Sequence, residues 1–206
     1  MNPRAQEASR HTHHVGRRIL IMGDPASGKS TLARRLAAVL DLPVIDIDDL
    51  HFPNGRQLAL EEVSARIEEV IATFAGGWVC DGGGPRGENP FAFHCDTLIR
   101  LKLSLHIVAW QAARRRARRL LGREVAPGPR ETIGRSFGRS SFLYWTIVRR
   151  RGSERRMREI VAAGGHERRL VVLSSQREIE ALLAELRAGR ARDATSERAE
   201  GQVEGS

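Results

Sequence analysis

Lysine is nearly absent from this chain: Lys29 and Lys102 are the only lysines among its 34 basic residues, and the other 32 are arginines. The formal net charge is +9, which is compatible with a nucleic-acid partner. So strong a preference for arginine is equally typical of coding bias, and the basic residues are spread along the chain, although 114–119 and 149–158 are dense. The charge therefore permits nucleic-acid binding but does not indicate it.

Cysteine and long apolar runs are also scarce. Cys80 and Cys95 are too few for a disulfide framework and lie in apolar segments, which predicts reduced thiols in the core. No apolar run approaches the roughly 18 residues of a membrane span. Residues 1–16 lack the continuous apolar stretch of a secretory signal. We therefore expect a cytoplasmic protein that does not enter a membrane.

The length and composition are those of one globular domain. The chain has 206 residues, of which 41% are hydrophobic and 29% are charged. The polar residues 1–16 predict a disordered leader, and 189–206 hold few large apolar side chains and predict a disordered tail. The domain itself is expected over 17–188, as a monomer or a homodimer.

Short apolar segments alternate with helical patterns, which predicts an α/β fold with a parallel sheet covered on both faces. Strands are expected at 18–22, 43–47, 78–81, 97–103 and 169–173. Helices are expected at 28–40, 60–74, from Ser104 past 121, at 142–163 and at 176–187. Residues 122–140 are rich in proline and glycine, which predicts an insertion of the lid type.

Residues 23–30, Gly-Asp-Pro-Ala-Ser-Gly-Lys-Ser, match the phosphate-binding pattern G-x-x-x-x-G-K-[ST] between a predicted strand and a predicted helix. Glycines let successive backbone N–H groups face phosphate oxygens, and the helix N-terminus adds partial positive charge. Lys29 is expected on the β- and γ-phosphates, and the Ser30 hydroxyl in the Mg²⁺ shell. The pattern thus predicts ATP and Mg²⁺ as ligands. The candidate nucleotide-binding residues are Gly23, Ala26, Ser27, Gly28, Lys29, Ser30 and Thr31.

Acidic residues follow the second and third predicted strands, at the edge where open α/β sheets bind ligands. Alternation along a strand predicts that Asp46 and Asp48 share one face. Asp81 is the candidate for the magnesium side and Asp48 for the acceptor side, with Asp46 as a rival for either role. Asp46 and Asp49 also fit the ordinary roles of helix caps or turn formers, which stays open. Glycines 82–84 fit either close approach to a ligand or a plain flexible turn.

Six arginines crowd residues 114–123 in a predicted helix. A charge on the apolar stripe of a helix is costly unless it is paired, so an arginine there is expected either to leave the core or to meet phosphate. The candidate catalytic phosphate contacts are Arg116, Arg119 and Arg123, followed by Arg135 and Arg139, whereas Arg114 and Arg118 are expected to point away. A solvated basic face is the alternative.

Together these residues resemble the small P-loop kinases of the adenylate, shikimate and gluconate kinase superfamily. Within it, the chain is most similar to the DNA topology modulation (FlaR-like) proteins. The likeness rests on the phosphate loop, on Ile-Asp-Asp-Leu-His-Phe at 47–52, on Trp-Val-Cys-Asp-Gly at 78–82, on Asp-Thr-Leu-Ile at 96–99, on the arginine-rich helix and on Tyr144-Trp145. It implies a P-loop NTPase fold with a five-stranded parallel sheet and a lid, ATP and Mg²⁺ as ligands, and transferase chemistry. Gly83 and Gly84 depart from the Asn-Tyr pair usual in that family, and Asp-Gly-Gly-Gly-Pro-Arg is closer to adenylate and shikimate kinases.

The sequence therefore supports two hypotheses about function. The first is a kinase that transfers the γ-phosphate of ATP to a nucleoside monophosphate or a small hydroxyl metabolite. The second is an ATP-binding regulatory or DNA-associated module with weak ATPase activity, which steeply salt-dependent DNA binding would favour.

Overall fold

The structure is a computed structural model. It describes residues 15–24, 27–53, 56, 58–82, 91–104, 107–108, 110, 114 and 169–203. The predicted lid at 122–140 and the predicted helix at 142–163 lie outside these residues, as does most of the helix expected after Ser104. Within them, no helix is long and apolar enough to cross a membrane.

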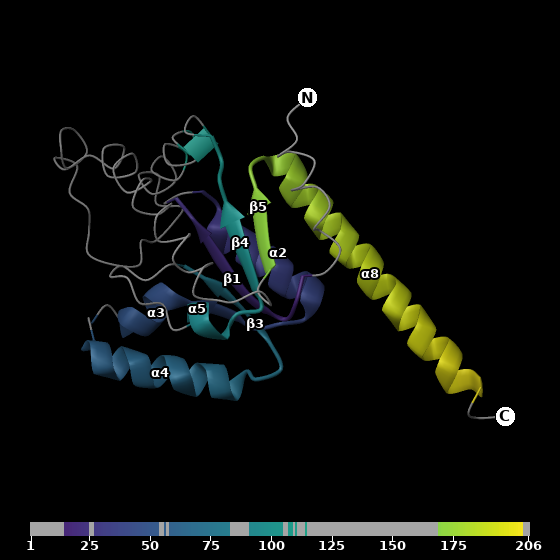
Figure 1. Cartoon of the computed structure of the whole chain (residues 1–206), viewed down its shortest axis with the longest axis horizontal. Helices are drawn as coiled ribbons and strands as arrows, with labels where there is room; N and C mark the ends of the chain where they lie inside the picture. The colour runs from purple at the N-terminus through teal and green to yellow at the C-terminus, as the bar shows by residue number, and fades with distance from the viewer. Residues whose placement is uncertain are drawn as a thin grey trace.

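The centre of the molecule is a five-stranded parallel sheet with the strand order β2-β3-β1-β4-β5 (Figure 1). Its strands are β1 (Arg18–Gly23), β2 (Val44–Asp46), β3 (Trp78–Asp81), β4 (Thr97–Leu101) and β5 (Arg169–Leu173). Ile19, Leu20 and Ile21 of the central strand are all completely buried, as expected when helices cover both faces. The predicted α/β fold with five parallel strands is confirmed.

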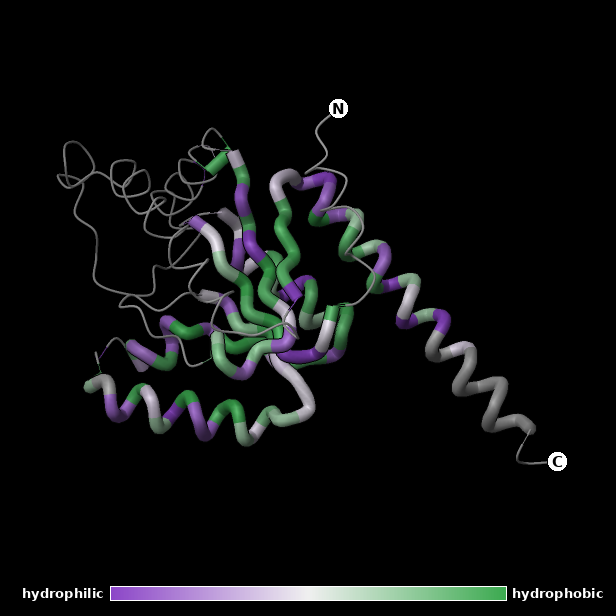
Figure 2. Tube along the Cα trace, viewed as in Figure 1, coloured by the Kyte–Doolittle hydropathy of each residue, from purple (hydrophilic) through white to green (hydrophobic). Residues whose placement is uncertain are grey.

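Each face of the sheet has its own hydrophobic core. The helices are α2 (Lys29–Leu40), α3 (Ile47–His51), α4 (Leu60–Thr73), α5 (Phe91–His94) and α8 (Gln176–Val203). Apolar residues of α2 and α8 pack on one face, and those of α3, α4 and α5 pack on the other. Figure 2 shows the hydrophobic residues concentrated along the strands, whereas α4 alternates between hydrophobic and hydrophilic residues. Cys80 and Cys95 are free thiols buried in the second core, which confirms that prediction.

Helix α8 is longer than predicted, because it continues through Val203 instead of ending at residue 187 (Figure 1). Alanine, arginine and glutamate dominate its last turns, and these strong helix formers extend a helix without large apolar side chains. Arg190, in the predicted tail, donates from its guanidinium to the Val39 carbonyl at 2.7 Å and lies 3.4 Å from the Asp41 carboxylate. The start of the predicted tail is therefore anchored to the end of α2.

A surface ion pair also joins α2 to α8. The Arg35 guanidinium donates to both carboxylate oxygens of Glu180, at 2.6 and 2.5 Å. This hydrogen bonding lowers the pKa of Glu180 to about 2, with a further contribution from the Gln176 amide. Because the folded pKa is depressed, the pair's stabilisation is present above the usual pKa and is lost as the pH falls through about 2.

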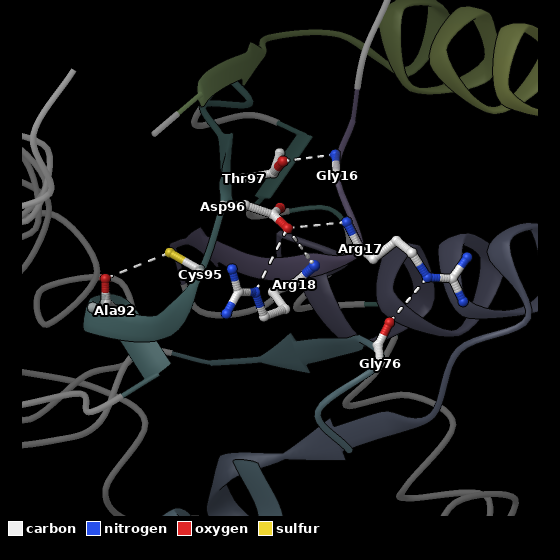
Figure 3. A network of polar contacts seen from close by, with 8 residues as sticks. All are labelled: Gly16, Arg17, Arg18, Gly76, Ala92, Cys95, Asp96 and Thr97. Carbon is white, nitrogen blue, oxygen red and sulfur yellow. Dashed lines mark hydrogen bonds and ion pairs between the residues drawn. The ribbon is translucent and has the colours of Figure 1, made fainter. Parts of the chain in front are cut away.

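The amino end of β1 is fixed by a polar network around Asp96 (Figure 3). One Asp96 carboxylate oxygen accepts from the backbone N–H groups of Arg17, at 3.1 Å, and Arg18, at 3.0 Å. The Gly16 N–H donates to the Thr97 hydroxyl at 2.9 Å. These polar contacts join residues 16–18 to the start of β4.

Candidate functional site

The phosphate-loop pattern falls between β1 and α2, as predicted. Gly28 precedes the helix in the left-handed conformation, with φ 89° and ψ 18°. Among the described residues, no side chain caps the first turn of α2, and no acidic residue stands in that turn. The N-terminus of this twelve-residue helix therefore presents backbone N–H groups and partial positive charge, which suit an anion.

The phosphate loop, residues 23–30, is held by hydrogen bonds to one of its own backbone carbonyls. The Lys29 ammonium donates to the Asp24 carbonyl at 3.0 Å, and the Ser27 N–H donates to the same oxygen at 3.1 Å. Lys29 is thereby held beside the start of α2 without any ligand. Asp24, which is 8% exposed, was not among the predicted site residues. Its signal in the sequence is that it is the one acidic residue in 23–30.

Gly23 and Ser27 fit against each other. A Cβ at Gly23 would lie 2.8 Å from the Ser27 hydroxyl oxygen and 2.9 Å from the Leu101 Cβ, so only glycine fits. Ser27 is 2% exposed, and its hydroxyl oxygen has no hydrogen-bond partner in the part of the chain that the structure describes. Ser30 is half-buried and Thr31 is exposed. Ala26 lies outside the described residues.

Asp46 and Asp81 stand side by side at the carboxyl ends of β2 and β3, in direct register. The residues before them, Ile45 and Cys80, lie in the core under α3, α4 and α5. Because side chains alternate along a strand, the two carboxylates are on the other face, which α2 covers. That is the face on which the phosphate loop leads into α2.

The two carboxylates differ in their surroundings. Asp81 is 6% exposed, and its Oδ1 has no hydrogen-bond partner among the described residues. Burial raises the pKa of Asp46, the hydrogen bond from the Asp48 N–H opposes this, and the charge of Asp81 raises it further. A buried carboxylate oxygen without a partner is costly unless a ligand satisfies it, so Asp81 fits the magnesium side of the site.

The prediction that Asp46 and Asp48 share a face was wrong. It extended the alternation of β2 to residue 47, but the strand ends at Asp46 and the chain enters α3 at once. The Asp46 carboxylate caps that helix by accepting from the Asp48 N–H at 2.9 Å, so the cap role left open for Asp46 is present. Asp48 and Asp49 lie exposed in the first turn of α3.

Gly82 turns the chain directly after Asp81, with a φ of 124°. A Cβ there would lie within 2.4 Å of the Ile47 Cγ2, at the start of α3. The absence of a side chain at Gly82 thus lets the start of α3 approach the end of β3 closely. Gly83 and Gly84 lie outside the described residues.

Replacing Gly82 by alanine is expected to destabilise the domain by about 2–4 kcal/mol, from the positive φ and the clash with Ile47 together. Thermal unfolding followed by circular dichroism measures the loss. Gly76→Ala is the matched control, because no atom lies within 4 Å of an added Cβ there. Equal melting temperatures for the two variants would contradict this account of the turn.

The arginine candidates Arg116, Arg119, Arg123, Arg135 and Arg139 lie outside the described residues, and so does Arg118. Arg114 is described, and its guanidinium lies 5.3 Å from the centre of the Trp110 ring. Both side chains are exposed, which agrees with the prediction that Arg114 points away from the core.

The sequence matches no protein-family model and no curated protein. Several solved structures share the arrangement of the sheet and helices. A shikimate kinase from Bacteroides thetaiotaomicron aligns with a TM-score of 0.50 and 15% identity, over 82% of this chain and 96% of that one.

Two further kinases align more loosely. A gluconokinase from Sinorhizobium meliloti 1021 gives a TM-score of 0.42 and 19% identity, over 88% of this chain and 95% of that one. A sugar kinase from Janibacter sp. HTCC2649 gives a TM-score of 0.46 and 15% identity, over 82% of this chain and 91% of that one. The order of the strands and the alignment with the shikimate kinase together show that the chain has the α/β fold of the P-loop kinases.

Proposed function

We propose that the protein is an ATP- and Mg²⁺-dependent phosphotransferase that moves the γ-phosphate to a small acceptor, either a nucleoside monophosphate or a hydroxyl metabolite. The observation that carries this proposal is the uncapped N-terminus of α2, with Gly28 in the left-handed conformation and the Lys29 ammonium held against the loop. A backbone cradle with one fixed cation suits a polyphosphate. The buried Oδ1 of Asp81 on the same face has no hydrogen-bond partner within the described ranges, which supports a metal beside it.

The proposed roles rest on these positions and on the phosphate-loop pattern of the sequence. The N–H groups of the loop and of the first turn of α2 bind the phosphates, with Gly23, Ala26, Ser27, Gly28 and Thr31 shaping that cradle. Lys29 neutralises charge on the β- and γ-phosphates. The Ser30 hydroxyl and the Asp81 carboxylate would hold Mg²⁺, which supplies charge neutralisation on the transferring phosphate.

A carboxylate is needed to accept the proton of the attacking group. Asp48, exposed on α3, is the proposed contact to the acceptor. Asp46 is the alternative, because burial raises its pKa and a carboxylate with a raised pKa accepts a proton more readily. Arg116, Arg119 and Arg123 are proposed to stabilise charge on the transferring phosphate.

The remaining proposals rest on the sequence. A similarity to the DNA topology modulation (FlaR-like) proteins is proposed from motifs that include those at 47–52 and 78–82. From the sequence we also propose that the protein is a cytoplasmic monomer or homodimer. Residues 122–140 are proposed to form a lid.

Release of ADP tests the proposed function. Purified protein with ATP and Mg²⁺ is assayed alone and with each of a set of small hydroxyl compounds and nucleoside monophosphates. We expect at least one acceptor to raise ADP release well above the rate with ATP alone and to appear as a phosphorylated product. ADP release that no acceptor changes would instead identify a slow ATPase.

A further inference from the structure

The segment from the start of β2 to Gly82 carries a net negative charge, whereas the whole chain is positively charged. Residues 44–82 hold eight acidic residues, two arginines and no lysine, in a chain with a net charge of +9. An arginine-rich composition would be expected to place arginines here as well. The acidic character of this segment is therefore a local property that the composition does not explain.

Four of these acids gather at the carboxyl edge of the sheet. Asp46 and Asp81 are in register on neighbouring strands, and Asp48 and Asp49 stand in the first turn of α3. The Asp46 carboxylate accepts from the Asp48 N–H at 2.9 Å, which ties the first turn of α3 to the end of β2. All four acidic residues therefore stand at the carboxyl edge of the sheet, where β1 also leads into the phosphate loop.

A separate observation indicates that this edge of the sheet receives a ligand. Asp81 is 6% exposed, and its Oδ1 has no hydrogen-bond partner in the described part of the chain. Buried polar atoms in folded proteins are nearly always satisfied, so an atom of this kind at the edge of a site indicates a group that binds there.

The acceptor has to enter on the α3 side. Its hydroxyl must reach both the γ-phosphate, proposed to lie at the N-terminus of α2, and a carboxylate that takes its proton. The candidate carboxylates, Asp46 and Asp48, stand where β2 passes into α3. The described basic groups on this side are His51, in the last turn of α3, and Arg56 beyond it.

We propose that the acceptor is a neutral or positively charged hydroxyl compound, such as a sugar, a polyol or an amino alcohol, and not a nucleoside monophosphate or a sugar acid. This rests on the proposed phosphotransferase function. Hydroxyl groups donate hydrogen bonds to carboxylates and an ammonium group pairs with them, whereas a phosphate or carboxylate on the acceptor is repelled by Asp46, Asp48 and Asp49.

The reaction balances as a simple displacement. The acceptor oxygen forms a bond to the γ-phosphorus, and the bond from that phosphorus to the β,γ-bridging oxygen breaks. ADP leaves with the electron pair of that bond. The hydroxyl proton passes to the Asp48 or Asp46 carboxylate and from there to water.

A panel of hydroxyl acceptors that differ in charge tests the proposal. Glucose, a pentitol, ethanolamine and an amino sugar are compared with adenosine monophosphate, gluconate and shikimate, with ADP release as the measure. We expect at least one neutral or cationic acceptor to raise ADP release about tenfold or more, and every anionic acceptor to leave it near the rate with ATP alone. Greater stimulation by an anionic acceptor overturns the proposal, and so does a lack of stimulation by any neutral or cationic one.

Charge removal at the site provides a second test. In an Asp48→Asn, Asp49→Asn variant, the stimulation of ADP release by the best cationic or neutral acceptor, divided by the stimulation by gluconate, is expected to fall about tenfold or more. Glu69→Gln, which removes an exposed charge from α4, is the control and is expected to leave the ratio unchanged. An unchanged ratio in the double variant contradicts the proposal.

A measurement of ATP binding with Mg²⁺ on the same wild-type sample distinguishes failure of the acceptor proposal from failure of the proposed phosphotransferase function. If ATP binds but an anionic acceptor is preferred, only the acceptor class is wrong. If ATP does not bind, the phosphotransferase function itself fails.

Discussion

Replacing Lys29 by alanine is expected to lower the rate of phosphoryl transfer by about 100- to 1,000-fold, the usual effect of removing one preorganised charge from a transition state. Lys29 is the first residue of α2, whose N-cap is Gly28, and its ammonium donates to the Asp24 carbonyl at 3.0 Å. Alanine keeps the helix, since it is the best helix former, but removes the charge. The measurement is kcat/KM for ATP with saturating acceptor, together with circular dichroism to confirm the fold.

Arg114→Ala is the control for the Lys29 variant. It also removes one positive charge, but from an exposed side chain stacked on Trp110. We expect its transfer rate to stay within about twofold of wild type, because exposed surface charges contribute little. Transfer at the wild-type rate by the Lys29 variant would mean that the loop does not bind the transferring phosphate.

Replacing Asp81 by asparagine is expected to abolish the stimulation of ATP binding by Mg²⁺ and to reduce transfer by about 100-fold or more. Asp81 is buried on the face that α2 covers, and its Oδ1 has no hydrogen-bond partner among the residues that the structure describes. Asparagine keeps the size of the side chain but has one oxygen and no charge, which makes it a poor ligand for Mg²⁺. Calorimetric titration of ATP with and without Mg²⁺ measures the effect.

Two results distinguish a metal-binding role of Asp81 from a structural one. Glu69→Gln removes an exposed carboxylate from α4 and is expected to leave the response to Mg²⁺ intact. The Asp81 variant is also expected to melt near the wild-type temperature, because a neutral amide is cheaper to bury than a charge. If Mg²⁺ still enhances ATP binding to this variant, Asp81 is not a metal ligand.

The central part of the fold could be predicted because its signals are local and strong. Trp78–Asp81 and Arg169–Leu173 have the predicted bounds, since apolar residues in a short run are typical of strands buried on both faces. Helix α2 begins at Lys29 because Gly28 adopts the left-handed conformation that the phosphate-loop pattern requires. The predicted strands were sufficient to place the candidate site at the carboxyl edge of the sheet.

The geometry around Asp46 could not be predicted, because a polar contact overrides the strand pattern there. Its carboxylate accepts from the Asp48 N–H and starts a helix, which moves Asp48 out of the alternation. The interaction of Asp46 with Asp81 joins strands that are distant in the sequence, so it appears only in the folded chain. Asp24 was missed because the loop pattern constrains its backbone and not its side chain.

The length of α8 was underestimated for a related reason. The prediction followed the apolar residues that pack on the sheet, such as Leu182 and Leu183, and these end well before the helix does. Beyond them the helix depends on residue propensity and on contacts such as that of Arg190 with α2. Apolar periodicity carries no information on either of these contributions.

The most direct test of the central claim, that the loop between β1 and α2 binds the phosphates of ATP, is isothermal titration calorimetry of the wild-type protein with ATP in the presence and absence of Mg²⁺. The account predicts one site with a dissociation constant between about 1 µM and 1 mM, tighter with Mg²⁺ and lost in the Lys29→Ala variant. Absence of binding to the wild type, or equal binding to both proteins, would contradict it.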